Sequence, residues 1–462
     1  MKWTKIDKDV KIYDNIYGFI SLNVIEANIL QHPLFQRLKN IKQLGFAYFV
    51  YPGATYTRFA HSIGVFELCN RFLSSLKTNS GESISKDDEK NLRMAALLHD
   101  IGHYPFSHVM EKFFGLNHEL NGKHVIESSD IKEYLQSNGY NVDDICSIIT
   151  GEYTGKKKND MFMRQILNSD LDVDRLDYLL RDSYYAGIPY GRIDLENITR
   201  NISIDDGELV IERKSIRSVD HFLNARMAMY DSVYTHKTSL AFDLMFNQLI
   251  TNLKEENAED FDIKLPNKFE DLEGFKFLDD NSVLARIYKF YESASKMAPK
   301  PPSIQKILPL CEAFLFRIPY KLIFEKSSFL AREKADRIKD AGTSKKRAES
   351  IRRFSIELED WLAKNIDCSF TILYKKGKPV NFSKGFPAIA LSSDPGCEKW
   401  KYEAIRVINE DGSKSFIHEE TNSILFFLSG YELYTIRVFY IKDEKNEEIE
   451  SMWKKYIAQE AS

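Results

Sequence analysis

The chain has 462 residues, of which 43% are hydrophobic and 29% are charged, and its formal net charge is -4. This length allows two or three domains and a large core, and the composition is ordinary for a globular protein. The small negative charge excludes a protein that coats nucleic acid over its whole surface and leaves only weak binding through local basic patches.

We expect neither a membrane span nor a secretory signal from the pattern of this sequence. No run of about 18 apolar residues is present, so we expect no membrane span and no membrane partner. The first residues lack the apolar segment of a secretory signal, which predicts a cytoplasmic protein. Five cysteines are widely spaced and none forms a C-x-x-C pair, so they are expected to be reduced thiols, mostly in the core.

The first predicted elements are a short hairpin or strand and two helices. Residues 9–25 alternate weakly between apolar and polar around Gly18, which favours a short hairpin or a strand before the first helix. Apolar residues then recur at helical spacing from Ile25 to Leu44, and Pro33 fits the first turn of a second helix. A loop with a Pro-Gly turn follows, and it leads to a predicted helix from Ser62 to Leu76.

The stretch from Leu92 to His108 (LRMAALLHDIGHYPFSH) sets the pair His99-Asp100 at the polar end of an apolar helix. Imidazole nitrogen and carboxylate oxygen are ligands that Mn, Fe, Zn and Ni accept, and a buried aspartate needs a cation to offset its desolvation. His103 follows one helical turn later. These residues therefore predict a site for a divalent transition metal, although a lone His-Asp pair is more often only a solvated helix end.

The next segments are mostly helical. Residues 117–150 predict two or three short helices, and residues 161–183 predict one helix. A small hairpin is expected around residues 205–211, followed by a long helix over residues 219–253. From about residue 255 the pattern changes to an α+β region. It contains a charged helical stretch at 329–364 and strand-like runs at 369–374, 402–407, 423–427 and 433–441.

Further polar residues are placed to join the central pair. Arg58 and His61 are three apart at a helix start, where a guanidinium can bind an anion beside an imidazole ligand. One helical face carries Asp174, Asp177, Tyr178, Arg181 and Asp182. An exposed, salt-bridged helix face would be the ordinary interpretation of that acidic stripe if it stood alone.

Two more groups suit acid-base chemistry and phosphate binding. His108 and Glu111 are three apart, and His118-Glu119 follow, so either histidine is a candidate general acid or base. A polar stripe is formed by Arg226, Tyr230, Tyr234 and Lys237. Cations suit phosphates and tyrosine rings suit a base or sugar, although each tyrosine taken singly is more often a core residue.

The motifs RFAHSIGV, LLHDIGHYPFSH, NHE, DVDRLDYLLRD and VYTHKT occur in this order, and their sequence resembles the HD-domain deoxynucleoside triphosphate triphosphohydrolases. The segment HPLFQRLKNIKQLG, followed by a Pro-Gly-Ala loop, is most similar to the catalytic part of the vertebrate members that also carry a SAM domain. The resemblance is strong over roughly residues 10–250. No SAM domain is recognised in this sequence.

The resemblance implies a mainly α fold with three parts. These are an N-terminal β arm (1–25), an all-helical HD-domain catalytic core (26–254) and a C-terminal α+β region (255–462) with a role in oligomerisation or regulation. It implies metal ligands at His61, His99, Asp100 and Asp174. It also implies hydrolysis between the sugar 5′ oxygen and the α-phosphorus, which releases deoxynucleoside and intact triphosphate.

By the same resemblance, His103, His108, Glu111 and His118 surround the α-phosphate. The acid is then His108 with Glu111, or His118, and the residues leave both open. Phosphates, carried with Mg, are held by Arg58, Arg175, Arg226 and Lys237. The 3′ hydroxyl is reached by Gln43, Tyr178 and Asp182. Tyr234 packs where a 2′ hydroxyl would collide, and the remaining substrate-binding residues are Leu44, Asp177 and Tyr230.

Departures from the family pattern bear on regulation. Gln31 and Lys39 stand where the vertebrate relative has an Asp and an Arg that read an activating guanine nucleotide, so guanine-specific activation is not expected, and activation by another nucleotide or by none stays open. Tyr230 replaces a histidine. The family assembles through dimers, so a homodimer or homotetramer is expected. The basic residues Lys345, Lys346, Arg347, Arg352 and Arg353 could serve assembly or form a solvated face.

The leading hypothesis is therefore a metal-dependent enzyme that hydrolyses deoxynucleoside triphosphates and lowers their pools, for example in antiviral defence. One alternative is an HD phosphohydrolase that acts on an alarmone or a cyclic nucleotide. The other is a regulator that binds nucleotides or nucleic acid without turnover. A complete set of metal ligands argues against the regulator, because decayed sites usually lose a ligand.

Overall fold

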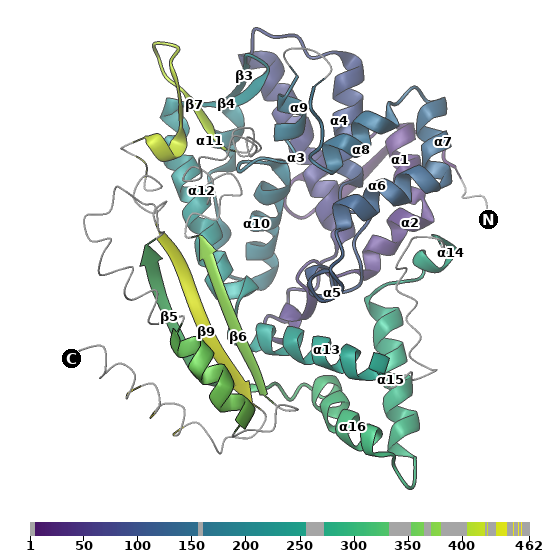
Figure 1. Cartoon of the computed structure of the whole chain (residues 1–462). Coiled ribbons are helices and arrows are strands. Elements are labelled where there is room, and N and C mark those ends of the chain that lie inside the picture. Colours follow the sequence, from purple (N-terminus) through teal and green to yellow (C-terminus); the bar gives the residue numbers. More distant parts are fainter. Residues whose placement is uncertain are drawn as a thin grey trace.

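A computed structural model gives the fold, and helices dominate it (Figure 1). The described residues are 5–155, 160–255, 272–331, 353–364, 371–379, 404–420, 423, 431–440, 447, 451 and 454. The expected mainly α class is confirmed. Among the described helices, none is long and apolar enough to cross a membrane.

The N-terminal part agrees with the sequence pattern. Strands β1 (Val10–Asp14) and β2 (Gly18–Leu22) form an antiparallel hairpin, and Gly18 adopts a φ of 77°, which favours glycine. Helix α1 (Val24–Gln31) begins at a capping box. Helix α2 (Pro33–Gln36) has its proline in the first turn, and a 3-10 turn (Arg37–Asn40) continues the chain.

Helix α3 (Arg58–Asn79) lies at the centre and packs against α4 (Lys86–Leu98) and α10 (Val173–Ala186). Gly64 explains how closely α3 and α10 approach, because a Cβ there would lie 2.0 Å from the Asp177 carboxylate on α10. The short helices that follow α4 are α5 (His108–Phe114), α6 (His118–Ser128), α7 (Asp130–Ser137) and α8 (Val142–Ile149). The last three confirm the short helices expected over residues 117–150.

Two helices expected to be continuous are interrupted. The first is divided into α9 (Phe162–Gln165) and α10. The break arises because the Asp172 side chain accepts the Arg175 N–H and starts a new helix. The second consists of α12 (Ile216–Met229) and α13 (Lys237–Glu255), separated by a π turn over residues 230–234. Thr235 bonds the Tyr230 carbonyl through both its N–H and its hydroxyl, at 2.9 Å each, which draws that carbonyl away from regular α-helical pairing.

A small mixed sheet beside α12 contains the expected hairpin. It is ordered β3 (Ile202–Asp205), β4 (Glu208–Glu212), β7 (Arg406–Ile408) and β8 (Lys414–Phe416). Strands β3 and β4 pair antiparallel, whereas β4 and β7 pair parallel. Helix α11 (Leu195–Arg200) precedes it. A segment about 200 residues later in the chain thus extends this hairpin.

The C-terminal region is α+β, as expected. Helices α14 (Leu272–Phe275), α15 (Asp280–Ser295) and α16 (Pro302–Leu315) follow α13. A separate antiparallel sheet places β9 (Tyr431–Tyr440) between β5 (Lys321–Ala331) and β6 (Thr371–Pro379), to one side of the helical core (Figure 1).

Several C-terminal expectations are only partly met. Residues 329–331, expected to be helical, belong to β5 because they pair with the start of β9. Residues 353–364 are helical, and 332–352 lie outside the described residues. The strand expected at 423–427 also lies outside them except for Ser423. Of the basic group at 345–353, only Arg353 is described, and it is exposed.

Candidate metal centre and histidine cluster

Three helices bring the four expected metal ligands together. His61 lies in the first turn of α3, the pair His99-Asp100 follows the last residue of α4, and Asp174 lies in the first turn of α10. The two imidazole Nε2 atoms are 3.4 Å apart. Asp174 Oδ1 lies 2.9 Å from Nε2 of His61 and 4.0 Å from Nε2 of His99, and Asp100 Oδ2 lies 3.8 Å from Nε2 of His61.

Both imidazoles are held by their other nitrogen. Nδ1 of His61 lies 2.7 Å from Asp177 Oδ2, and Nδ1 of His99 lies 2.9 Å from the Ala96 carbonyl. If each Nδ1 donates to these oxygens, each Nε2 presents a lone pair toward the other and toward the two carboxylates. Ligand atoms of His61, His99 and Asp100 lie within 4.8 Å of one another. This buried set of acceptors fits a divalent cation.

The pKa values of His61 and Asp100 show which charge the centre favours. Burial would lower the pKa of His61, but the hydrogen bonds to Asp174 and Asp177 outweigh it and raise that pKa to about 10. Burial would raise the pKa of Asp100, but Arg58 and the neighbouring imidazoles hold it well below its usual range. The surroundings therefore favour positive charge at this point, and a metal ion supplies it without a proton.

Asp177 lies behind His61 and not in an open pocket. It is fully buried, and its two oxygens contact Arg181 Nε and Nη2 at 3.0 Å each. Arg181 in turn donates to Asp14 at the end of β1, at 2.8 Å. Asp177 was expected among the substrate-binding residues, but its oxygens are already engaged, so its position suits support of a metal ligand.

Arg58 joins the metal centre to the loop after it. Its Nη1 donates to Asp100 Oδ2 at 2.8 Å, and its Nε donates to the Ser107 hydroxyl at 2.8 Å. The buried Nη2 has no hydrogen-bond partner among the described residues. Arg58 therefore retains one donor for an anion such as a phosphate. Nothing in the sequence pattern indicated that Ser107 would bind Arg58.

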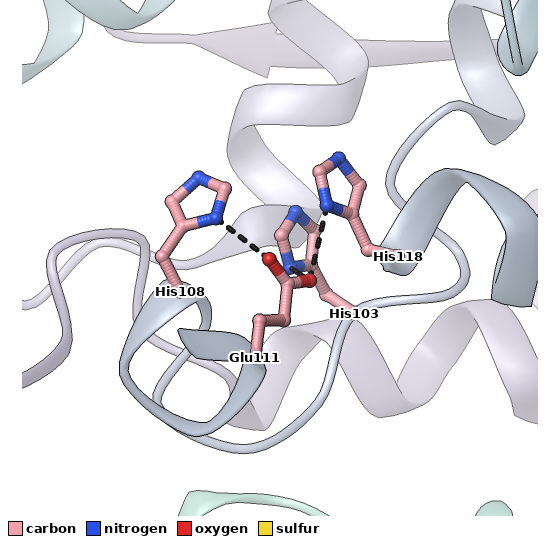
Figure 2. Close-up of side chains that lie close together, drawn as sticks. All are labelled: His103, His108, Glu111 and His118. Carbon is pink, nitrogen blue, oxygen red and sulfur yellow. Dashed lines mark hydrogen bonds and ion pairs between the residues drawn. The ribbon is translucent and has the colours of Figure 1, made fainter. Parts of the chain in front are cut away.

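A second cluster surrounds Glu111 (Figure 2). One carboxylate oxygen lies 3.0 Å from Nδ1 of His103 and 3.0 Å from Nδ1 of His118, and the other lies 2.8 Å from Nδ1 of His108. The rings of His103 and His118 stack at 3.8 Å. Nε2 of His103 lies 3.1 Å from Asp100 Oδ1, so the two clusters share a boundary.

The second cluster suits proton transfer. Burial opposes ionisation of Glu111, but the imidazoles hold its pKa far below the usual range. Burial and the charge of His103 lower the pKa of His118 to about 4. The side chain of His108 is 55% exposed and that of His118 is 20% exposed, so both can reach a ligand. The four side chains are also close enough to hold a metal ion.

Tyrosines and Asp182 line the neighbouring region. The Tyr234 hydroxyl donates to Asp182 at 2.6 Å, and the Tyr56 hydroxyl donates to its other oxygen. Burial raises the pKa of Asp182 to about 6. The rings of Tyr178 and Tyr230 lie 6.1 Å and 5.3 Å from that of Tyr234. The π turn thus brings the expected tyrosines together, whereas Tyr56 was not expected.

The remaining expected residues occupy different surroundings. Gln43 has a buried Oε1 without a hydrogen-bond partner among the described residues. Arg175 and Arg226 are buried, and both lower the pKa of Tyr178 against the effect of its burial, so both lie near that ring. Lys237 is exposed at the start of α13. Leu44 is half-buried beside the core.

Comparisons with known proteins identify two regions of this chain. Residues 58–182 match the model of the HD domain, and residues 193–292 match that of the HD associated region. An uncharacterized protein of Methanocaldococcus jannaschii is 36% identical, over 60% of this chain and 57% of its own length. The deoxynucleoside triphosphate triphosphohydrolase SAMHD1 of Homo sapiens is 30% identical, over 61% of this chain and 51% of its own length.

A solved structure extends the likeness to nearly the whole chain. The crystal structure of a phosphohydrolase from Bacteroides thetaiotaomicron superimposes with a TM-score of 0.69 and 28% identity, and the match covers 94% of this chain and all of that one. By contrast, the chain spans only about half of the length of the curated relatives that it matches, between 50% and 63%.

Proposed function

Because the chain carries an HD domain with its associated region and is related to the SAMHD1 triphosphohydrolases, we propose that it is a metal-dependent hydrolase of deoxynucleoside triphosphates. Its products are deoxynucleoside and inorganic triphosphate. The observation that carries the proposal is the contact between the two clusters, 3.1 Å from His103 to Asp100. Candidate acid-base residues thereby lie directly beside the proposed metal centre, an arrangement that suits metal-assisted phosphoester hydrolysis.

A divalent transition ion, such as Mn, Fe, Zn or Ni, fits the group His61, His99 and Asp100, and Asp174, 2.9 Å from His61, is the proposed fourth ligand. When bound, the ion would activate water and polarise a phosphoryl oxygen. The protein's own residues do the rest. Arg58 uses its unpaired Nη2 to hold a phosphate close to Asp100. Arg175, Arg226 and Lys237 bind the remaining phosphates, which carry Mg.

Protonation of the leaving 5′ oxygen falls to His108 or His118. His108 is favoured because its side chain is 55% exposed and its Nδ1 is held 2.8 Å from Glu111, which leaves Nε2 to face a ligand. The carboxylate of Glu111 stabilises the imidazolium before it gives up its proton. His118 shares the same carboxylate and is the alternative acid.

Recognition of the sugar falls to Asp182, Gln43 and the tyrosines. Asp182 already accepts two tyrosine hydroxyls, and its oxygens can also accept a 3′ hydroxyl. The ring of Tyr234, fixed by this bond, occupies the place of a 2′ hydroxyl and favours deoxynucleotides. We also propose that the protein forms homo-oligomers, that a nucleotide effector binds it, and that its activity lowers deoxynucleotide pools.

The test is a substrate panel. Metal-loaded protein is incubated with each deoxynucleoside triphosphate singly and in pairs, with ribonucleotides, with a guanosine alarmone and with cyclic nucleotides, and products are resolved by ion-exchange chromatography. Inorganic triphosphate and deoxynucleoside are expected, and a protein with His99→Ala and Asp100→Ala together should form neither. Turnover of only the alarmone or a cyclic nucleotide would reassign the substrate, and binding without turnover would replace the enzyme by a regulator.

A further inference from the structure

The segment that joins α4 to α5 has an unusual backbone conformation between two histidines of the second cluster, His103 within it and His108 at the start of α5. Phe106 and Ser107 both have positive φ angles, 54° and 55°, although neither is glycine. Each such residue costs on the order of 1 kcal/mol or more and persists only where the surroundings hold it. His103 and His108 flank these two residues, so whatever holds this segment also sets where the two imidazoles lie.

One buried carboxylate from outside the HD domain holds it. Asp280, the first residue of α15, is 0% exposed and lies in the HD associated region. Its Oδ1 accepts the Phe106 N–H at 2.6 Å, and its Oδ2 accepts the Lys42 N–H at 3.0 Å. The Ser107 hydroxyl donates to the Lys42 carbonyl at 2.9 Å, which closes a ring of contacts around the strained pair.

The same turn before α15 fixes the other end of the segment. Arg37 donates through Nη1 to the Leu278 carbonyl at 2.8 Å and through Nη2 to the His103 carbonyl at 2.6 Å and the Ile101 carbonyl at 3.1 Å. Its guanidinium lies 3.9 Å from the centre of the Phe275 ring. Residues 275–280 therefore act on both ends of segment 101–108.

We infer that Asp280 is a positioning residue: through the Phe106 and Lys42 amides, the HD associated region sets the backbone that presents His103 and His108. The consequence for catalysis rests on the proposed function, whereas the effect on the backbone does not. The carboxylate suits this task because both of its oxygens accept, and two N–H donors face it. Burial raises the pKa of Asp280 to about 6 although the Lys42 ammonium lies 3.8 Å from Oδ2, so holding a charge here is costly even with that partner.

The cost of burying the Asp280 charge allows an experiment to distinguish a positioning role from a purely structural one. An asparagine of the same shape is cheaper to bury, so a merely structural site should tolerate it or gain stability. For positioning, asparagine fails, because its amide has one acceptor and its NH2 would face one of the two backbone N–H donors. Asp280→Asn therefore releases either Phe106 or Lys42 while it adds no bulk.

The matched control is Asp279→Asn. Asp279 is the preceding residue, and its side chain accepts the Ser282 N–H at 2.8 Å to cap α15. Asparagine caps helices as well as aspartate does, so this variant removes a negative charge that acts on Arg37 and Asp280 but keeps every hydrogen bond that holds segment 101–108. Arg37→Lys provides a second variant on the same segment, because lysine cannot reach three carbonyls in one plane.

Four quantities are measured on the full chain: amide hydrogen exchange of peptides covering residues 101–108, the amount of bound metal, and kcat and KM for deoxynucleoside triphosphates. In Asp280→Asn we expect exchange at least about tenfold faster and kcat about 100-fold lower, the loss typical of a 1 Å misplacement. KM should stay within about twofold and metal content should not change. Asp279→Asn should match the natural chain throughout.

Unchanged exchange in Asp280→Asn, faster exchange with unchanged kcat, or equal losses in the Asp279→Asn control would each overturn the inference. Should Asp280→Asn not fold, Arg37→Lys carries the same expectations. If the natural chain turns over no nucleotide, the proposed function fails alone, and the exchange measurement still decides whether Asp280 holds the segment.

Discussion

Replacing Asp177 with asparagine tests how the fold supports the metal centre. The carboxylate lies 2.7 Å from Nδ1 of His61 and also contacts Arg181. An asparagine that keeps its carbonyl oxygen on His61 turns its NH2 toward the Arg181 guanidinium, where two donors face each other. Turned the other way, it leaves the imidazole without an acceptor and with a free choice of tautomer.

The magnitude follows from this geometry. Loss of such an outer partner typically weakens metal binding 10- to 100-fold, which corresponds to about 1.4 to 2.7 kcal/mol. The Arg181 guanidinium keeps its contact with Asp14 at 2.8 Å, so we expect the variant to fold, with a lower melting temperature. The hydrogen bond of His61 is therefore the main loss at the site.

The assay is an apparent dissociation constant for Mn²⁺, measured by competition with a chelator, together with the metal content of purified protein. Asp172→Asn serves as the control, because Asp172 is equally buried near the start of the same helix but pairs with Arg175. We expect Asp177→Asn to bind about 10- to 100-fold more weakly. If both variants retain the natural affinity, Asp177 does not support the metal ligand.

Three further outcomes are expected. Gly102→Ala should lower kcat by about 100-fold and cost about 1 to 3 kcal/mol in urea unfolding, because its Cβ would lie 2.2 Å from the backbone of α6, which carries His118; natural kcat would refute it. The raised pKa of Asp182, about 6, means that its contribution to stability is complete below pH 4 and is lost as the pH rises through 6, about 3 kcal/mol in all. The free energy of unfolding of Asp182→Asn, measured between pH 4 and 8, should not show this loss. If it falls with pH in parallel with that of the natural chain, Asp182 is not the source of the loss. Tyr234→Ala should raise ribonucleotide turnover relative to deoxynucleotide turnover, and an unchanged ratio would remove its steric role.

The four proposed metal ligands could be named from sequence because each one lies in a short motif of the family that the chain resembles. His99-Asp100 ends an apolar helix, and His61 and Asp174 begin helices, so secondary structure alone places all four at helix ends. The structure brings them together as expected. Their convergence depends on close helix packing, which the small residue Gly64 allows.

Other features could not be predicted because they depend on tertiary contacts. The helical stripe placed Asp177 and Asp182 on one face, but spacing does not say that Asp177 meets His61 while Asp182 meets tyrosines. The π turn depends on Thr235 bonding one carbonyl twice, which has no periodic signature. Asp280 acts 174 positions away from Phe106, in a segment without any motif.

The central claim is tested most directly by hydrolysis in water enriched in ¹⁸O, with metal-loaded protein and a deoxynucleoside triphosphate, followed by mass spectrometry of the products. Attack at the α-phosphorus predicts inorganic triphosphate that carries one ¹⁸O atom and a deoxynucleoside that carries none. Label in the deoxynucleoside, or pyrophosphate with a deoxynucleoside monophosphate as the products, would contradict the account.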